Sequence, residues 1–127
     1  MMEYYANHIH ANFVFKNKAG KQAWNGWKRQ VDAAWASSFH TWAMEWNASD
    51  ITLFLDGALV NTERVAVADG TSWPNPWRGE PVYMILNQAL GGKNGGDPTK
   101  ASQWPIALEV DYVRYWVRAH PARPRFR

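Results

Sequence analysis

Apolar and polar residues alternate along several short stretches of this chain, which is the pattern of β-strands with one buried face. The clearest stretch is Phe39 to Trp46, in which every second side chain belongs to one face: His40, Trp42, Met44 and Trp46. Similar patterns run from His10 to Phe15 and from Ile106 to Val117, and a mainly apolar stretch runs from Val82 to Leu90. Each of these stretches predicts a strand.

Turn-forming residues separate the predicted strands. Asp56-Gly57 lies between Ile51 to Leu55 and Ala58 to Val65, and an Asp-Gly pair in this position is typical of a two-residue hairpin. Glycine and proline are concentrated in 69–81 and 91–98, which predicts two surface loops. Gly20, Asn25 and Gly26 are interpreted as breaks within a polar loop, and Lys28 to Trp35 is compatible with a helical turn.

Five or six strands and no helix of ordinary length predict an all-β chain folded as an antiparallel meander. A sheet this apolar needs a second layer against its buried face. The expected fold is therefore an antiparallel β-sandwich that is incomplete in this chain and is completed by oligomerisation or strand exchange, because open strand edges and an uncovered apolar face favour association. The expected oligomer is a symmetric assembly of copies of this chain.

Composition and charge narrow the choice of partners. The formal net charge is +3, and three arginines of the basic Pro/Arg tail 119–127 account for all of it: Arg123, Arg125 and Arg127. A nucleic-acid surface requires basic residues along a folded face, so no nucleic-acid partner is expected. The absence of cysteine excludes disulfides and thiolate metal sites. No apolar stretch is long enough to span a membrane, and no secretory leader is recognised, so no membrane partner is expected.

Three blocks of residues, in order, resemble glycoside hydrolase family 16. The block FHTWAMEW at 39–46, followed by 51–57, is similar to "FHxYAxEW…I…YVDG". The block PVYMILNQALGG at 81–92 is similar to "PxYLILNLAxGG", and 95–98, 104–105 and 109–114 resemble "GGDP…FP…VDYVRVY". The resemblance implies a jelly-roll sandwich of the concanavalin A-like type, of which 1–118 would be the C-terminal half.

The resemblance also implies a catalytic residue. The family's active-site strand carries "E-x-D-x-x-E", with a nucleophile, an assisting aspartate and a general acid/base in that order. Met2-Glu3-Tyr4-Tyr5 resembles the end of "EIDIMEYY", which assigns the acid/base to Glu3 and leaves the other two carboxyls outside the chain. We therefore expect a truncated reading frame or cloned fragment that is inactive alone. Glu3 is expected to be either an ordered cleft residue or a frayed terminal one.

Sugar-binding candidates follow from the same resemblance. His10 and Asn12 match positions whose side chains face the sugar, whereas Val14 departs from the histidine that many laminarinase-like members carry. Asn87 matches the asparagine of "LNLA" and is expected either to bind a sugar hydroxyl or to be a buried amide paired with backbone. The aromatic candidates are Trp42 and Trp77.

Nine tryptophans also suit a protein that holds flat sugar faces. Core packing is the expected role of Trp46, while the tryptophans assigned to loops are candidates for stacking on sugar or for packing: Trp24, Trp27, Trp73 and Trp77.

No cofactor is required by this chemistry, although the resemblance implies a structural calcium ion at Asp111. Calcium prefers six to eight oxygen ligands, so Asp111 alone would bind it weakly, and pairing with Arg114 or backbone is the alternative. The expected partner is a β-linked polysaccharide or oligosaccharide, with β-1,3-glucan favoured over mixed-linkage glucan and agar. The expected function is hydrolysis of O-glycosyl bonds by a secreted parent enzyme, and the alternative is a lectin-like scaffold without catalysis.

Overall fold

The fold was analysed in a computed structural model, which describes residues 1–5, 7–16, 19–32, 34–47, 49–64, 83–91, 98–99 and 104–118. Its regular elements, in chain order, are β1 (Met2–Tyr5), β2 (His8–Lys16), β3 (Gln22–Gln30), the short 3₁₀ helix η1 (Trp35–Ser37), β4 (Trp42–Trp46), β5 (Asp50–Leu55) and β6 (Ala58–Arg64). No helix in this described part is long and apolar enough to cross a membrane.

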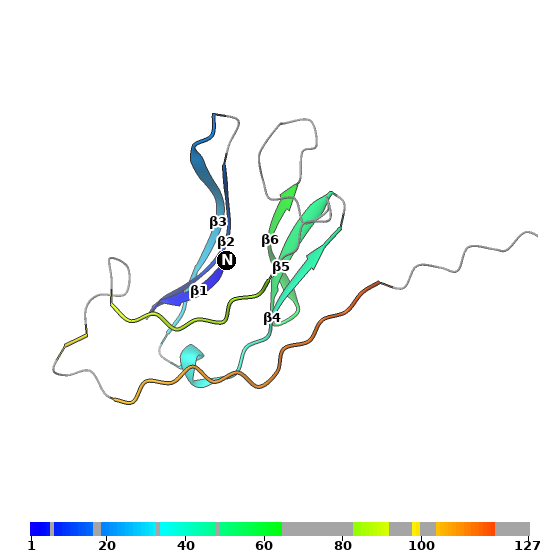
Figure 1. Ribbon diagram of the computed structural model, residues 1–127. Coiled ribbons are helices and arrows are strands. Elements are labelled where there is room, and N and C mark those ends of the chain that lie inside the picture. The colour runs from blue at the N-terminus through cyan, green and yellow to red at the C-terminus, as the bar shows by residue number, and fades with distance from the viewer. Residues whose placement is uncertain are drawn as a thin grey trace, which may run out of the picture.

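The six strands form two antiparallel sheets. One sheet has the order β1-β2-β3 and the other β4-β5-β6, so each is a simple meander. The sheets stand beside each other with η1 in the connection between them (Figure 1). The prediction of an all-β, partial sandwich is confirmed.

The core lies between the facing sides of the sheets. Ile9, Ala11 and Phe13 alternate along β2 and are buried, as are Ile51, Leu53 and Leu55 along β5. Ala11, Phe13, Ile51 and Leu53 form one cluster, against which three half-buried tryptophans pack: Trp27, Trp42 and Trp46. Full burial of a large aliphatic or aromatic side chain is worth about 1.5–3 kcal/mol, so this cluster supplies the main attraction between the sheets.

Strand β3 corrects the interpretation of 20–35. Asn25 and Gly26 do not break the pattern but lie within β3, and Lys28 continues the same strand instead of starting a helical turn, which begins only at Trp35. Gly26 pairs with Asn12 on β2, and a Cβ atom at Gly26 would lie 3.0 Å from Asn12 Oδ1. The glycine is therefore explained by close approach of a neighbouring side chain, a recognised reason for glycine inside a strand.

The hairpin predicted at Asp56-Gly57 is confirmed. Leu55 pairs with Ala58, and both turn residues have positive φ, 51° for Asp56 and 79° for Gly57. This is the backbone of a type I′ turn, whose twist matches that of the strands it joins. A register shift between Leu53 and Phe54 marks a bulge in the β5–β6 pair.

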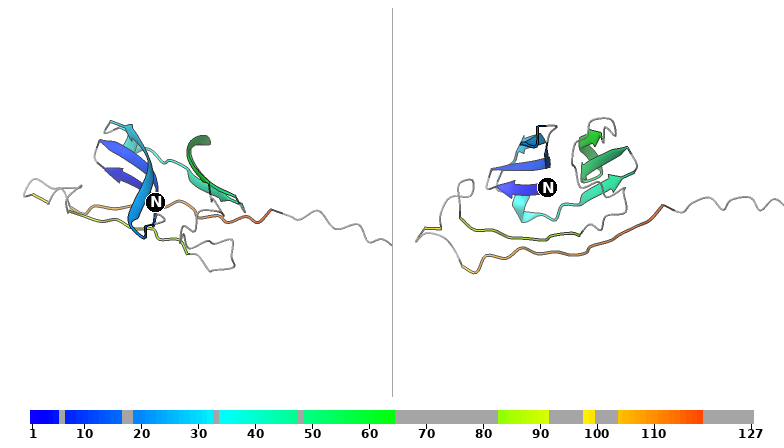
Figure 2. Two further views of the ribbon diagram at one scale, coloured as in Figure 1. Left: turned by 90° about the horizontal axis from the view of Figure 1, so that it is seen from above. Right: turned by 45° about the horizontal axis from the view of Figure 1, so that its top comes forward.

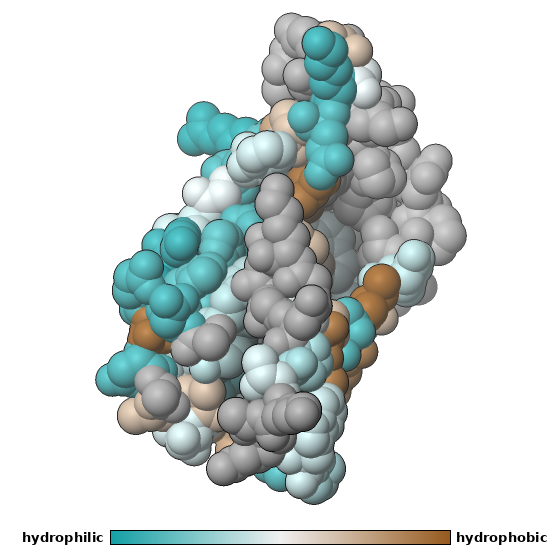
Figure 3. All heavy atoms as spheres, turned by 90° about the vertical axis from the view of Figure 1, so that its left-hand side faces the viewer, coloured by the Kyte–Doolittle hydropathy of each residue, from teal (hydrophilic) through white to brown (hydrophobic). Residues whose placement is uncertain are grey.

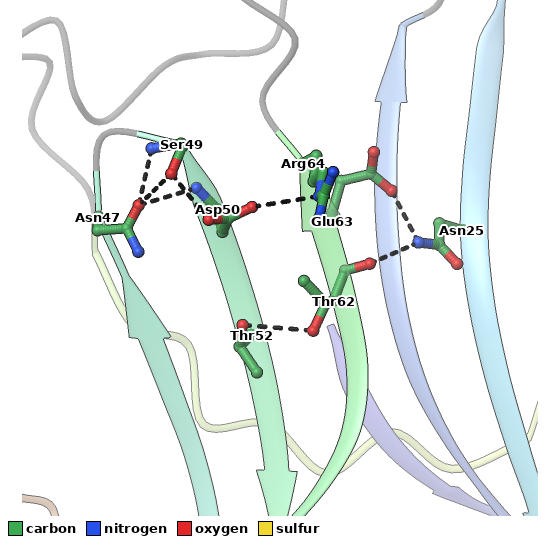
Figure 4. Close-up of polar contacts among 8 residues, drawn as sticks. All are labelled: Asn25, Asn47, Ser49, Asp50, Thr52, Thr62, Glu63 and Arg64. Atoms are coloured by element: carbon green, nitrogen blue, oxygen red, sulfur yellow. Dashed lines mark hydrogen bonds and ion pairs between the residues drawn. The ribbon is translucent and has the colours of Figure 1, made fainter.

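Polar side chains connect the two sheets along one margin. Asn25 on β3 donates through Nδ2 to the Thr62 carbonyl, at 3.0 Å, and to Glu63 Oε2, at 2.8 Å, both on β6 (Figure 4). Asn61 on β6 donates in the opposite direction to the Ala11 carbonyl, at 2.8 Å. These bonds satisfy half-buried amides and fix the position of β6 relative to β2 and β3.

Two extended segments differ from the prediction. Residues 83–90 and 105–118 run alongside each other in opposite directions (Figures 1 and 2), but neither is part of a strand ladder in the described structure. The strands expected at Val82–Leu90 and Ile106–Val117 are therefore wrong for this chain as folded. Alternation indicates which residues a sheet would bury, but a strand also requires an edge with which to pair. The basic tail 119–127 lies outside the described residues.

Candidate active site

The outer face of the sheet β1-β2-β3 is polar, because residues that alternate with the core residues must point to the opposite side. This polar face carries the following side chains from the three strands: Glu3, Tyr5, His8, His10, Asn12, Val14, Trp24, Lys28 and Gln30. Figure 3 views the molecule from the side toward which this face points, and much of the surface shown there is hydrophilic.

Glu3, His10 and Lys28 form one row across the polar face. Glu3 on β1 pairs with His10 on β2, which pairs with Lys28 on β3. Glu3 and His10 are both half-buried. The start of β1 is anchored to β2, since the backbone N–H of Asn12 donates to the Met1 carbonyl at 2.7 Å. Glu3 is thus an ordered strand residue, as the first expectation requires, and not a frayed terminal one.

Aromatic rings surround His10. The Tyr5 ring lies edge-on to it at a centroid distance of 5.3 Å, and the His8 ring is tilted against it at 4.9 Å. Partial desolvation lowers the pKa of His8, and the positive charges of Lys28 and His10 lower it further. Near neutral pH this arrangement favours an uncharged His8 ring.

Asn12 lies next to this row on the same strand. Its Nδ2 lies 3.3 Å from His10 Nδ1, where it donates a hydrogen bond when the ring carries its proton on Nε2. The facing position on β3 is Gly26, so the residue paired with Asn12 carries no side chain.

Val14 and Trp24 form the next cross-strand pair. Val14 is 39% exposed and Trp24 is 68% exposed, so this end of the polar face presents apolar surface to solvent. Sequence reasoning placed Trp24 and Trp27 together in a loop. Their spacing of three residues in a strand instead places them on opposite faces, and Trp27 packs against the core.

The polar-face residues named above offer one carboxyl, two imidazoles and the Lys28 ammonium group for chemistry. Glu3 is the only Asp or Glu within β1, β2 and β3. A carboxyl beside hydroxyl-binding groups is suited to proton transfer and to binding sugar hydroxyls. His8 and Lys28 belong to this arrangement, although the sequence alone did not single them out. Strand pairing, which the sequence pattern does not define, is what brings them to Glu3.

The other sequence-predicted residues lie elsewhere. Trp42 on β4 packs against the core cluster and lies edge-on to Trp35 at 6.3 Å, so it does not join the polar face. Trp46 packs on the core as expected. Asn87 is exposed within 83–90, which contradicts its interpretation as a buried amide. Trp77 lies outside the described residues.

Asp111 is exposed on the extended segment 105–118, where the Arg114 guanidinium lies over the Tyr112 ring at 4.2 Å. The described residues contain no group of three histidine or acidic side chains able to hold a metal ion, Asp111 included. They therefore do not fit a calcium site by themselves, since calcium requires at least six oxygen ligands.

Comparison with known proteins gives this face a context. The family model described as "Glycosyl hydrolases family 16" matches residues 2–114. A Beta-glucanase of Rhodothermus marinus is 35% identical over 86 residues, which cover 63% of this chain and 29% of that protein. The Glucan endo-1,3-beta-glucosidase A1 of Niallia circulans is 32% identical over 85 residues, covering 64% of this chain and 12% of that protein.

A third relative has a different kind of name. The Beta-1,3-glucan-binding protein of Penaeus monodon is 25% identical over 103 residues, which cover 65% of this chain and 27% of that protein. The chain thus spans less than a third of the length of each of these three relatives.

Proposed function

Because the chain belongs to glycosyl hydrolase family 16, we propose that it forms part of a retaining endo-β-glycan hydrolase in which Glu3 is the general acid/base. The observation that carries this proposal is the cross-strand row of Glu3, His10 and Lys28, with Asn12 beside it, on a polar face whose reverse side is the core. Such a face can hold a sugar chain against a fixed proton donor.

A retaining mechanism requires two carboxyl groups about 5–5.5 Å apart. One attacks the anomeric carbon while the other donates a proton to the departing glycosidic oxygen, and the second group later removes a proton from the attacking water. In this proposal Glu3 has the second role, and Asn12 and His10 orient the sugar through its hydroxyls. Strands β1 to β3 hold no other carboxyl, so the 127-residue chain is expected to hydrolyse little or nothing by itself.

The proposed substrate is a β-1,3-linked glucan. The relatives from Niallia circulans and Rhodothermus marinus are named for glucan hydrolysis, which favours a glucan over a galactan such as agar. Because a polysaccharide is too large to enter a cell, the proposal includes action outside the cell. His10 and Asn12 are the proposed contacts to the sugar; Asn87 and Trp77 are further candidates, and a role for Asp111 in calcium binding would need ligands beyond the described residues.

The second candidate function is sugar binding without catalysis. Binding without catalysis is favoured by the single carboxyl among the strands of the polar face, because the retaining mechanism requires two. The relative named Beta-1,3-glucan-binding protein also favours it. A protein of this kind would use the same residues to hold glucan, while Glu3 would be dispensable.

Release of reducing sugar from laminarin, lichenan and agarose by this chain, with Glu3→Gln as the matched variant, tests the catalytic proposal. Both proteins are expected to be inert toward all three polymers and to bind laminarin equally well. Turnover by the unmodified chain that disappears in Glu3→Gln would show that a second carboxyl is supplied within the chain or its assembly. Turnover that survives Glu3→Gln would remove Glu3 from the mechanism.

We further propose that copies of the chain associate. Residues 83–90 are exposed throughout, and large apolar side chains are exposed along 105–118, among them Ile106, Leu108, Val110, Val113 and Val117. Exposed apolar side chains of this kind favour association, and symmetric dimers are the commonest result. Sedimentation velocity at micromolar concentration is expected to show a dimer or larger species, and a compact monomer would contradict this proposal.

A further inference from the structure

Trp24 is the most exposed tryptophan of the two sheets, and it lies on the same face as Glu3. Its side chain is 68% exposed, whereas Trp27, Trp42 and Trp46 are half-buried against the core. An indole ring left in water contributes nothing to core packing, so packing gives no reason for a large aromatic residue at this position. Its partner across the sheet, Val14, is too small to cover the ring.

The indole of Trp24 and the amide of Asn12 converge above Gly26. A Cβ atom built on Gly26 would lie 3.6 Å from Trp24 Cδ1 and 3.0 Å from Asn12 Oδ1. The Asn12 amide and the Trp24 indole therefore lie side by side over Gly26, where a Cβ atom would press against the amide oxygen. A pyranose ring has an apolar face and a rim of hydroxyl groups, so it can stack on the indole while one hydroxyl group meets the amide.

The Trp24 row is well separated from the acid. Val14, opposite Trp24, is four positions along β2 from His10, opposite Glu3. At about 3.4 Å per residue this is roughly 14 Å along the strand, which is longer than one sugar ring. A ring at Trp24 would consequently not carry the glycosidic oxygen that Glu3 protonates, but would be a more distant unit of the same chain.

We infer that Trp24 is a stacking platform for a glucosyl unit remote from the cleaved bond, with Asn12 beside it providing the hydrogen bond to a hydroxyl of the bound chain and Gly26 leaving room for the Asn12 amide. This inference rests on the proposed function, because the ligand is the β-linked glucan named there. Trp24, which sequence reasoning assigned to a loop, thereby becomes a binding residue. Affinity would then depend on a part of the polymer that does not react.

The test is isothermal titration calorimetry, in which a linear β-1,3-glucan hexasaccharide is added to the 127-residue chain. Trp24→Ala is expected to weaken binding about tenfold, and Trp24→Phe to recover part of the affinity, because a smaller aromatic ring still stacks. Gly26→Ala is expected to weaken binding while leaving the indole in place, because its Cβ would lie 3.0 Å from Asn12 Oδ1 and displace the amide, but 3.6 Å from Trp24 Cδ1. Trp116→Ala is the matched control, because Trp116 is 74% exposed on a different segment, and it is expected to bind like the unmodified chain.

Two results would overturn the inference, and they are distinguishable. If Asn12→Ala weakens binding tenfold while Trp24→Ala binds like the unmodified chain, the platform is wrong and the proposed function stands. If the unmodified chain does not bind the hexasaccharide or laminarin, both the platform and the proposed function are wrong. Circular dichroism of each variant provides the check that β-sheet content is unchanged.

Discussion

Within the described residues, two pairs of a histidine and a carboxylate are built in opposite ways. On the polar face, Glu3 and His10 are partners by strand register, on the neighbouring strands β1 and β2. At the end of the second sheet, His40 and Asp56 hold each other directly, with His40 Nδ1 2.8 Å from Asp56 Oδ2. We call this second arrangement the His40–Asp56 clasp.

The polar groups of the clasp are occupied by neighbours within the protein. His40 Nε2 lies 2.9 Å from the Trp35 carbonyl, and the His40 ring stacks on Trp35 at a centroid distance of 3.9 Å. Asp56 Oδ1 accepts a hydrogen bond from the backbone N–H of Thr41 at 2.9 Å. A pair with its donors and acceptors used in this way has a structural role, whereas the proposed function assigns the Glu3–His10 row to binding a ligand.

The largest expected effect is a difference in the free energy of unfolding between a variant of the clasp and a variant of the Glu3–His10 pair. Asp56→Ala removes two hydrogen bonds to a charged group and places alanine at a φ of 51°, so it is expected to lower the free energy of unfolding by about 2 kcal/mol. Glu3→Gln keeps the size of a half-buried side chain and is expected to change the free energy by less than about 0.5 kcal/mol. Urea unfolding followed by tryptophan fluorescence measures both.

Asp56→Asn is the matched control for the clasp. Asparagine tolerates positive φ, and its amide oxygen still accepts the Thr41 N–H, so about half of the loss should be recovered. A Glu3→Gln variant as unstable as Asp56→Ala would show that Glu3 is a structural residue, and the contrast between the two pairs would then be lost.

The sequence predicted the fold class but not every strand. Alternation in 39–46 and the Asp56-Gly57 turn led to the correct assignment of β4, β5 and β6, because a hairpin depends only on neighbouring residues. Strand β3 was missed because Gly26 was interpreted as a break, although the Asn12 side chain requires it. The strands expected in 83–118 were wrong because their pairing depends on an edge that alternation does not define.

The site was predicted to a similar degree. Resemblance placed Glu3, His10 and Asn12 together, and the structure brings these three to one face, although their chemical roles remain predictions. Trp42 was expected to bind sugar but packs against the core cluster, because neither resemblance nor alternation shows which side of the sandwich a strand face belongs to. Lys28 and Trp24 depend on the register between β2 and β3, which short sequence patterns do not specify.

The smallest expected effect is the pH dependence of the clasp. Desolvation alone would raise the pKa of Asp56, but the hydrogen bonds from His40 and from the Thr41 N–H, together with the positive charges of His40 and Arg29, lower it overall. A carboxyl with a lower pKa in the folded state stabilises the fold above its unfolded pKa of about 3.9, and this contribution is lost as pH falls through the folded value. Because the Asp56 side chain is 48% exposed, solvent screening limits the contribution to less than about 1 kcal/mol. Urea unfolding between pH 6 and about pH 3 should therefore show the unmodified chain losing its advantage over Asp56→Asn as the pH falls, and a constant difference across this range would mean that the charge of Asp56 contributes nothing to the clasp.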